Sequence, residues 1–237
     1  MHTEWPASSG GPVVAALPAR LPPALWLGTL AAFVGAHVLM FSVVHPYVDT
    51  RLCVARLQDP FFELVAYDRR WYFVTHQIYY VLTFTGIGAF VWQAVRGDHR
   101  PVMRFAAALS LQALLRCATL SLIPLCRATV TPGTAVLTEV PTVDLGFAQL
   151  PWLLWATNDL VFSGHVGEFL IMMWVGRSWP LPARLVLILF QILQAYGLIA
   201  TRGHYAVDLL LALPCAYFAD AMAQRLLVRV GTRRRRA

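Results

Sequence analysis

The stretch Asn158-Asp159-Leu160-Val161-Phe162-Ser163-Gly164-His165 opens an apolar segment that continues to about Val175. It places a titratable histidine where the chain enters a membrane. Charged side chains at such depth cost about 2.5–3.5 kcal/mol each on insertion scales, so an ionisable residue there is a candidate functional residue. A second group of this kind, His204-Tyr205-Ala206-Val207-Asp208, begins the last apolar segment. We expect the two stretches to meet in space.

The composition around these stretches is that of a membrane protein. The 237 residues are 58% hydrophobic and only 13% charged, whereas about 25% charged is typical of soluble domains. This predicts an all-α, polytopic membrane protein with one domain. The net charge of +7 comes from 19 basic residues, all of them arginine, in short loops and at the C-terminal end. That distribution indicates that the arginines set the membrane topology and contact anionic lipids, rather than bind nucleic acid.

Six apolar segments have a length close to that of a membrane-spanning helix, since about 20 residues at 1.5 Å each cover a hydrocarbon core of roughly 30 Å. The fourth is shorter than the others. We expect a six-helix transmembrane catalytic domain over residues 23–230, between a flexible cytoplasmic tail (1–22) and a basic cytoplasmic tail (231–237). A short interfacial helix is expected near 61–65. The predicted spans are 25–44, 73–95, 105–125, 160–175, 185–200 and 204–227.

Arginine placement predicts the orientation. If six spans alternate, the arginines at 96–104, those at 177–184 and the terminal cluster lie on one side. The positive-inside rule makes that side cytoplasmic, together with both termini. The acidic loop 126–157 and the neighbouring ends of the third, fourth and sixth spans then face outward. The absence of lysine favours a GC-rich genome, so we expect a bacterial inner-membrane protein with its site toward the extracytoplasmic leaflet.

His204 and Asp208 are four residues apart, so on a helix they share one face. The carboxylate can accept the Nδ1–H of the imidazole and leave Nε2 free to attack, which is the logic of a catalytic triad with histidine as nucleophile. His165 on another span is the natural acid–base, a role typically worth about 100- to 10,000-fold in rate. Attack on a phosphodiester is the chemistry that this set favours.

A phosphodiester also requires positive charge and hydrogen-bond donors. Arg116 lies inside the third span and needs a polar cavity or a counter-charge, and Thr119 falls on the same face. Gly164 allows close approach of the backbone to a phosphate, Ser163 adds a hydroxyl, and the start of the fourth span attracts anions through its unpaired N–H groups. Tyr205 completes the candidate binding residues of the second stretch.

Several polar residues allow two interpretations. Asp159 is either a helix N-cap or a site residue, and Glu168 can pair with Arg116, line the cavity or bind an amine. His76, Gln77, Tyr79 and Tyr80 favour an interfacial aromatic belt over cation–π contact with a quaternary ammonium. We expect no role for three histidines, His37, His45 and His99.

The set Asp159-x-x-x-Ser163-Gly164-His165 and His204-Tyr205-x-x-Asp208 resembles the sphingomyelin synthase branch of the lipid phosphate phosphatase (PAP2) superfamily. Arg116-Cys117-Ala118-Thr119 with Pro124 looks like the third-helix motif of that branch. The resemblance covers roughly residues 110–215. It implies six spans and transfer of a phosphoryl head group from a phospholipid to ceramide without a metal or cofactor. By matched position, His204 is the nucleophile, Asp208 its orienting partner and His165 the acid–base.

The sequence departs from both branches of the superfamily. Animal synthases carry Cys-Gly before the aspartate and Thr after Ser-Gly-His, where this chain has Thr157-Asn158 and Val166. The phosphatase branch has a Lys-x6-Arg-Pro motif, but here Gln93 stands in place of the lysine before Arg100-Pro101. That branch also has an arginine six residues before the last histidine, where this chain has Leu198. The synthase branch therefore fits better.

The predicted function is a metal-independent phospholipid:ceramide head-group phosphotransferase, or one acting on a related lipid alcohol of the diacylglycerol type. It releases diacylglycerol by way of a phosphohistidine-type intermediate. The alternative is hydrolysis by a lipid phosphatase or phospholipase C, which needs the same residues. A non-enzymatic lipid transporter or scaffold is disfavoured because His165, His204 and Asp208 are all present.

Overall fold

A computed structural model describes residues 22–50, 57–123, 125, 143–144, 149–150 and 161–233. The expected acidic loop lies almost wholly outside these residues, as does the predicted N-terminal tail apart from Pro22. The expected basic tail begins as helix, because α8 (Ala206–Arg233) reaches Arg233.

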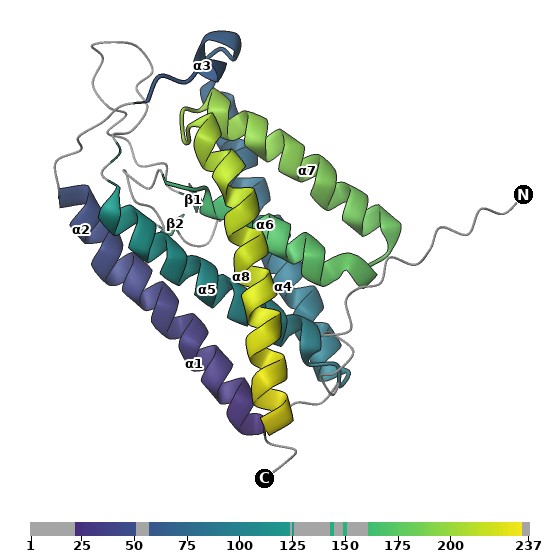
Figure 1. The fold of residues 1–237 in the computed structure, drawn as a ribbon. Helices are drawn as coiled ribbons and strands as arrows, with labels where there is room; N and C mark the ends of the chain where they lie inside the picture. The colour runs from purple at the N-terminus through teal and green to yellow at the C-terminus, as the bar shows by residue number, and fades with distance from the viewer. Residues whose placement is uncertain are drawn as a thin grey trace, which may run out of the picture.

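Most of the described chain is helical (Figure 1). Proline at the first or second position marks the start of α1 (Pro23–Leu39), α5 (Arg100–Leu122) and α7 (Leu181–Ala200), because the missing N–H costs nothing in the first turn. The other elements are η2 (Met40–Val44), α2 (His45–Thr50), α3 (Phe61–Leu64), η3 (Arg69–Trp71), η4 (Phe73–Ile78), α4 (Tyr79–Val95), β1 (Val143–Asp144), β2 (Gln149–Leu150), α6 (Gly164–Val175) and η5 (Gly176–Ser178). The two short strands pair antiparallel, and α3 lies where a short helix was expected.

Helix α5 is the centre of the bundle and packs against α1, α4, α6 and α8 (Figure 1). Helix α8 meets α5 and α6 through a stripe of fully buried alanines, which allows close helix approach in a membrane. Phe90, Phe105, Phe169 and Phe190 fill the core among α4, α5, α6 and α7. The alanines of the stripe are Ala212, Ala216, Ala219 and Ala223.

Five helices in the described residues are long and apolar enough to cross a membrane. They correspond to the first, second, third, fifth and sixth predicted spans and support an integral membrane protein. They cover Pro23–Val48, Arg69–Val95, Arg100–Leu122, Leu181–Ala200 and Ala206–Val230.

The fourth predicted span differs from the other five. The helix found there, α6, has 12 residues and is about 18 Å long, too short to cross the hydrocarbon core alone. It is enclosed by its neighbours, with Phe169, Ile171 and Met172 fully buried. The prediction of six membrane-spanning helices is therefore not confirmed. The short helix instead brings its own N-terminus inside the bundle.

Candidate active site

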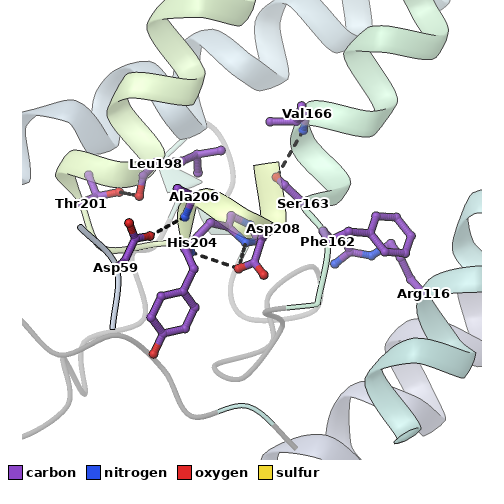
Figure 2. Close-up of polar contacts among 11 residues, drawn as sticks. Asp59, Arg116, Phe162, Ser163, Val166, Leu198, Thr201, His204, Ala206 and Asp208 are labelled. Atoms are coloured by element: carbon purple, nitrogen blue, oxygen red, sulfur yellow. Dashed lines mark hydrogen bonds and ion pairs between the residues drawn. The ribbon is translucent and has the colours of Figure 1, made fainter. Parts of the chain in front are cut away.

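The buried start of α6 organises the site. The N-cap residue Ser163 is fully buried, and its hydroxyl accepts a hydrogen bond from the Val166 N–H at 3.3 Å. The Ser163 N–H donates to the backbone carbonyl of Asp208 at 3.0 Å. The carbonyl of Phe162 accepts from Nη1 of Arg116 at 2.7 Å. Figure 2 shows Arg116 on one side of this turn and the first turn of α8 on the other. Three segments far apart in the sequence thus meet at residues 162–164.

This geometry decides the question of the helix cap. The residue that caps α6 is Ser163, so the interpretation of Asp159 as that cap is wrong. Asp159 itself lies outside the described residues, and its proposed role at the site stays a prediction.

Arg116 is 95% buried and lies against the start of α6. Its guanidinium carbon is 5.5 Å from the centre of the Phe162 ring. A Cβ atom added to Gly164 would lie 2.5 Å from Nη1 of Arg116, far inside van der Waals contact. The group that lies close to Gly164 is therefore the Arg116 guanidinium, whereas the sequence led us to expect a phosphate there. The guanidinium lies at the N-terminus of α6, the positive end of the helix, where an anion is favoured.

His204 lies beside Asp208, with Nδ1 at 3.4 Å from Oδ2. The expectation that both residues lie on one helical face is wrong in detail, because α8 begins only at Ala206 and His204 belongs to the preceding turn. Asp208 closes this turn, since its Oδ2 also accepts the N–H of Tyr205 at 3.0 Å. Asp208 is fully buried and His204 nearly so, so the pair is shielded from solvent. Figure 2 shows the two side chains at this turn.

His165, in the first turn of α6, stands between this pair and α4. The centre of its ring lies 6.3 Å from that of His204, 6.1 Å from that of His76 and 4.5 Å from that of Tyr79. The two histidines predicted to share the chemistry are thus close enough to act on one small group.

A cavity of about 230 Å³ opens beside His165. It lies among α1, η2, α4, α5 and α6. Its polar lining includes Arg116, Gly164, His165, Glu168, Tyr79, Tyr80, Thr83, Gln112, His37 and His45. Glu168 lines the cavity, as one of its interpretations expects, and accepts a hydrogen bond from the Tyr79 hydroxyl. Its binding of an amine stays a prediction.

Two predicted binding residues lie away from this cavity. The hydroxyl of Thr119 bonds to backbone carbonyls within its own helix, those of Leu115 and Arg116. The Tyr205 ring is 1% exposed and stacks on Phe62, with ring centres 5.6 Å apart. Neither residue lines the cavity, and their roles in substrate binding stay predictions.

The sequence reasoning missed four residues. His37 and His45 were expected to have no role and yet line the cavity, and Tyr79 and His76 were assigned to an aromatic belt but are buried against His165. A signal was present: positions 33, 37, 41 and 45 are Phe, His, Phe and His at a spacing of four. Their rings form one row, with centres 4.2, 6.1 and 5.1 Å apart. His99, in contrast, accepts a hydrogen bond from Trp26 and does not line the cavity.

His204 is not part of the cavity lining and lies beyond His165, under the segment 59–65. Asp59 accepts the N–H of Ala206 at 2.5 Å. Arg202 donates to the carbonyls of Phe62 and Val65, each at 2.9 Å. These bonds hold the segment over the turn that carries His204.

Within the residues that the structure describes, no group of three or more His, Cys, Asp or Glu side chains is arranged to hold a metal ion. The expectation of metal independence stays a prediction.

Part of the chain matches a known protein family. Residues 157–219 match the family model described as PAP2 superfamily C-terminal. This segment contains α6, α7 and the first half of α8, and with them His165, His204 and Asp208. No curated protein matches the chain. The match supports the PAP2 superfamily and a lipid phosphatase or phosphotransferase type of activity, consistent with an enzyme whose substrates are lipids. It does not distinguish the branches of the superfamily.

The contact between Gly164 and Arg116 gives a first prediction. In Gly164→Ala the new methyl group displaces the guanidinium, and displacements of about 1 Å in a site cost up to roughly 100-fold in rate. We expect turnover of a lipid phosphate ester to fall at least tenfold. Gly88→Ala is the matched control, because nothing lies within 4 Å of a Cβ atom at that position on α4. Equal activity of the two variants, both purified as folded monodisperse protein, would refute the assigned contact.

Proposed function

We propose that this protein transfers the phosphoryl head group of a phospholipid to ceramide or a related lipid alcohol and releases diacylglycerol. It would thus act as a sphingomyelin synthase or ceramide phosphoethanolamine synthase. The observation that carries the proposal is the pairing of His204 with Asp208, next to His165, at a turn whose other side holds the Arg116 guanidinium. The four side chains supply a nucleophile, its orienting carboxylate, an acid–base and a fixed positive charge.

In the first step, Nε2 of His204 attacks phosphorus and forms an N–P bond. The P–O bond to diacylglycerol breaks, and the protonated imidazole of His165 gives its proton to the leaving alkoxide. Asp208 keeps the proton on Nδ1 of His204 and stabilises the positive charge that develops on this ring. Arg116 offsets the charge of the non-bridging phosphate oxygens.

In the second step, the neutral His165 removes the proton from the hydroxyl of the acceptor. The resulting oxygen nucleophile attacks phosphorus, the N–P bond breaks, and His204 returns to its starting state. The same residues serve both half-reactions, because the second step reverses the first with a different alcohol.

The chemistry of the cavity favours a head group that carries an ammonium cation. Glu168 supplies a carboxylate, and Tyr79 and Tyr80 present aromatic rings to the same space, with Phe84 beside them. Aromatic faces and a carboxylate together attract choline or ethanolamine cations. Glu168 is held in place by the Tyr79 hydroxyl, so the anionic group is oriented before a lipid binds.

Hydrolysis is the second candidate, as a lipid phosphatase or a phospholipase C-type enzyme. It uses the same first step, after which water replaces the lipid alcohol. The burial of His204 favours it, because a water molecule reaches a buried intermediate more easily than a second lipid does.

A lipid assay separates these functions. Purified protein is incubated with labelled phosphatidylcholine or phosphatidylethanolamine, with and without ceramide, and the products are resolved. We expect a phosphosphingolipid that forms only with ceramide. Diacylglycerol released equally without ceramide would show a hydrolase, and no turnover of either lipid would favour a scaffold or transporter.

The nucleophile is tested by trapping. With a donor labelled at phosphorus, quenched protein is expected to carry an acid-labile, alkali-stable label, as a phosphohistidine does. His204→Ala should abolish both the label and turnover, whereas His99→Gln, at a histidine away from the site, should keep both. A label that persists in His204→Ala would overturn the assigned nucleophile.

We further propose a bacterial inner-membrane protein with cytoplasmic termini and the site toward the extracytoplasmic leaflet, from the arginine distribution. Single cysteines engineered at positions 132–145, in a variant without the native cysteines, should react with a membrane-impermeant reagent in intact cells. Cysteines engineered at 97–99 should react only after the cells are opened. The reverse pattern would contradict this orientation.

A further inference from the structure

A second cavity, of about 360 Å³, lies at the other end of the bundle from His165. Along α5, Arg104 precedes Arg116 by twelve residues, and along α8, Asp220 follows Asp208 by twelve. Each interval corresponds to about 18 Å of helix. The two helices thus place this cavity near the opposite leaflet from the candidate active site.

The floor of the cavity is a buried ion pair. Arg104 donates to both carboxylate oxygens of Asp220, from Nε at 2.7 Å and from Nη2 at 2.6 Å. Gln224 donates to the same carboxylate at 2.8 Å. The two charged side chains are 11% and 7% exposed. The pair fixes α5 to α8 and cancels its own charge, so the ligand preference of the cavity is set by the remaining residues.

Two further arginines line the cavity, Arg177 from η5 and Arg184 from α7. Both are exposed. Within the described part of the chain, neither lies within 4.0 Å of a carboxylate oxygen. An adjoining cavity shares Arg104, Arg177 and Gln224, and its additional arginine, Arg100, is already paired with Asp98. The net charge offered to a ligand is therefore about two positive charges on one rim.

The remaining wall is apolar and is exposed on the outside of the bundle. Ile188 is 39% exposed and Tyr217 66% exposed, and the Trp174 ring meets that of Tyr217 edge-on at 6.1 Å. Tyrosine and tryptophan at this depth suit the boundary between head groups and acyl chains. The cavity thus offers cations on one side and an apolar surface, continuous with the membrane, on the other.

We propose that this cavity binds the phosphate of an anionic phospholipid from the leaflet opposite the candidate active site. Arg177 and Arg184 would contact the phosphate oxygens, and an acyl chain would lie along Ile188 and Tyr217. Basic cavities between membrane helices are suited to anionic head groups. A zwitterionic lipid gains less, because its ammonium group meets the same two arginines. The site is separate from the proposed reaction and does not depend on it.

Equilibrium binding by native mass spectrometry in a neutral detergent tests the proposal. The full chain is titrated separately with short-chain phosphatidylglycerol, phosphatidylcholine and inorganic phosphate. Phosphatidylglycerol should bind most tightly. The double variant Arg177→Gln/Arg184→Gln should weaken its binding roughly 30-fold, which corresponds to about 1 kcal/mol for each arginine near the membrane surface.

The matched control is Arg96→Gln/Arg225→Gln, which removes the same charge at the same end but touches neither cavity. It should keep the affinity of the unmodified protein for phosphatidylglycerol. Equal losses in the two double variants would show a general charge effect and overturn the site. Binding of phosphatidylcholine as tight as that of phosphatidylglycerol would also overturn it. Displacement of phosphatidylglycerol by equimolar inorganic phosphate would overturn the lipid as the ligand.

Discussion

The constraint on which this structure depends is the need to satisfy buried backbone groups at the start of α6. In an apolar bundle, an unsatisfied N–H or C=O group costs several kcal/mol, and a helix start exposes several of them. Here the acceptors and donors come from other helices: Arg116 binds the Phe162 carbonyl, and the Asp208 carbonyl accepts from Ser163. The residues that allow a helix to begin inside the bundle are thus also those that surround His165.

This double use explains the shape of the site. Because Gly164 has no side chain, the Arg116 guanidinium can lie against the first turn of α6, so a fixed positive charge and a helix N-terminus coincide. Asp208 uses its backbone carbonyl for Ser163 and its carboxylate for His204 and Tyr205. A change at Gly164 or at Asp208 therefore alters both the support of the start of α6 and the electrostatics of the site.

The sequence predicts most of the fold, because long apolar segments have few alternatives to membrane-spanning helices. Five of the predicted spans correspond to helices of sufficient length. The segment at 160–175 was ambiguous, because hydropathy shows that it is apolar but not that it is surrounded by protein. Its helix begins at Gly164, where a serine cap and an arginine from α5 make a buried start possible. That arrangement depends on tertiary contacts that a local pattern does not contain.

At the site, the spacing of residues along the sequence indicated which side chains are close only within a single segment. The four-residue interval between His204 and Asp208 correctly indicates proximity, although a turn rather than a helix provides it. The row of rings from Phe33 to His45 has the same four-residue spacing. The sequence does not indicate which other helix these rings face. The bonds of Asp59 to Ala206 and of Arg202 to Phe62 join distant segments, and no pattern in a single sequence indicates them.

The bond from Ser163 to Asp208 has a consequence for biogenesis. A chain is synthesised from its N-terminus, so α6 leaves the ribosome before α8 exists. Until α8 has been inserted, the buried Ser163 N–H lacks its acceptor and His165 lacks its neighbour His204. The contacts that support the start of α6 therefore form only when α5, α6 and α8 lie in the membrane together, so the early helices alone do not assemble the surroundings of His165.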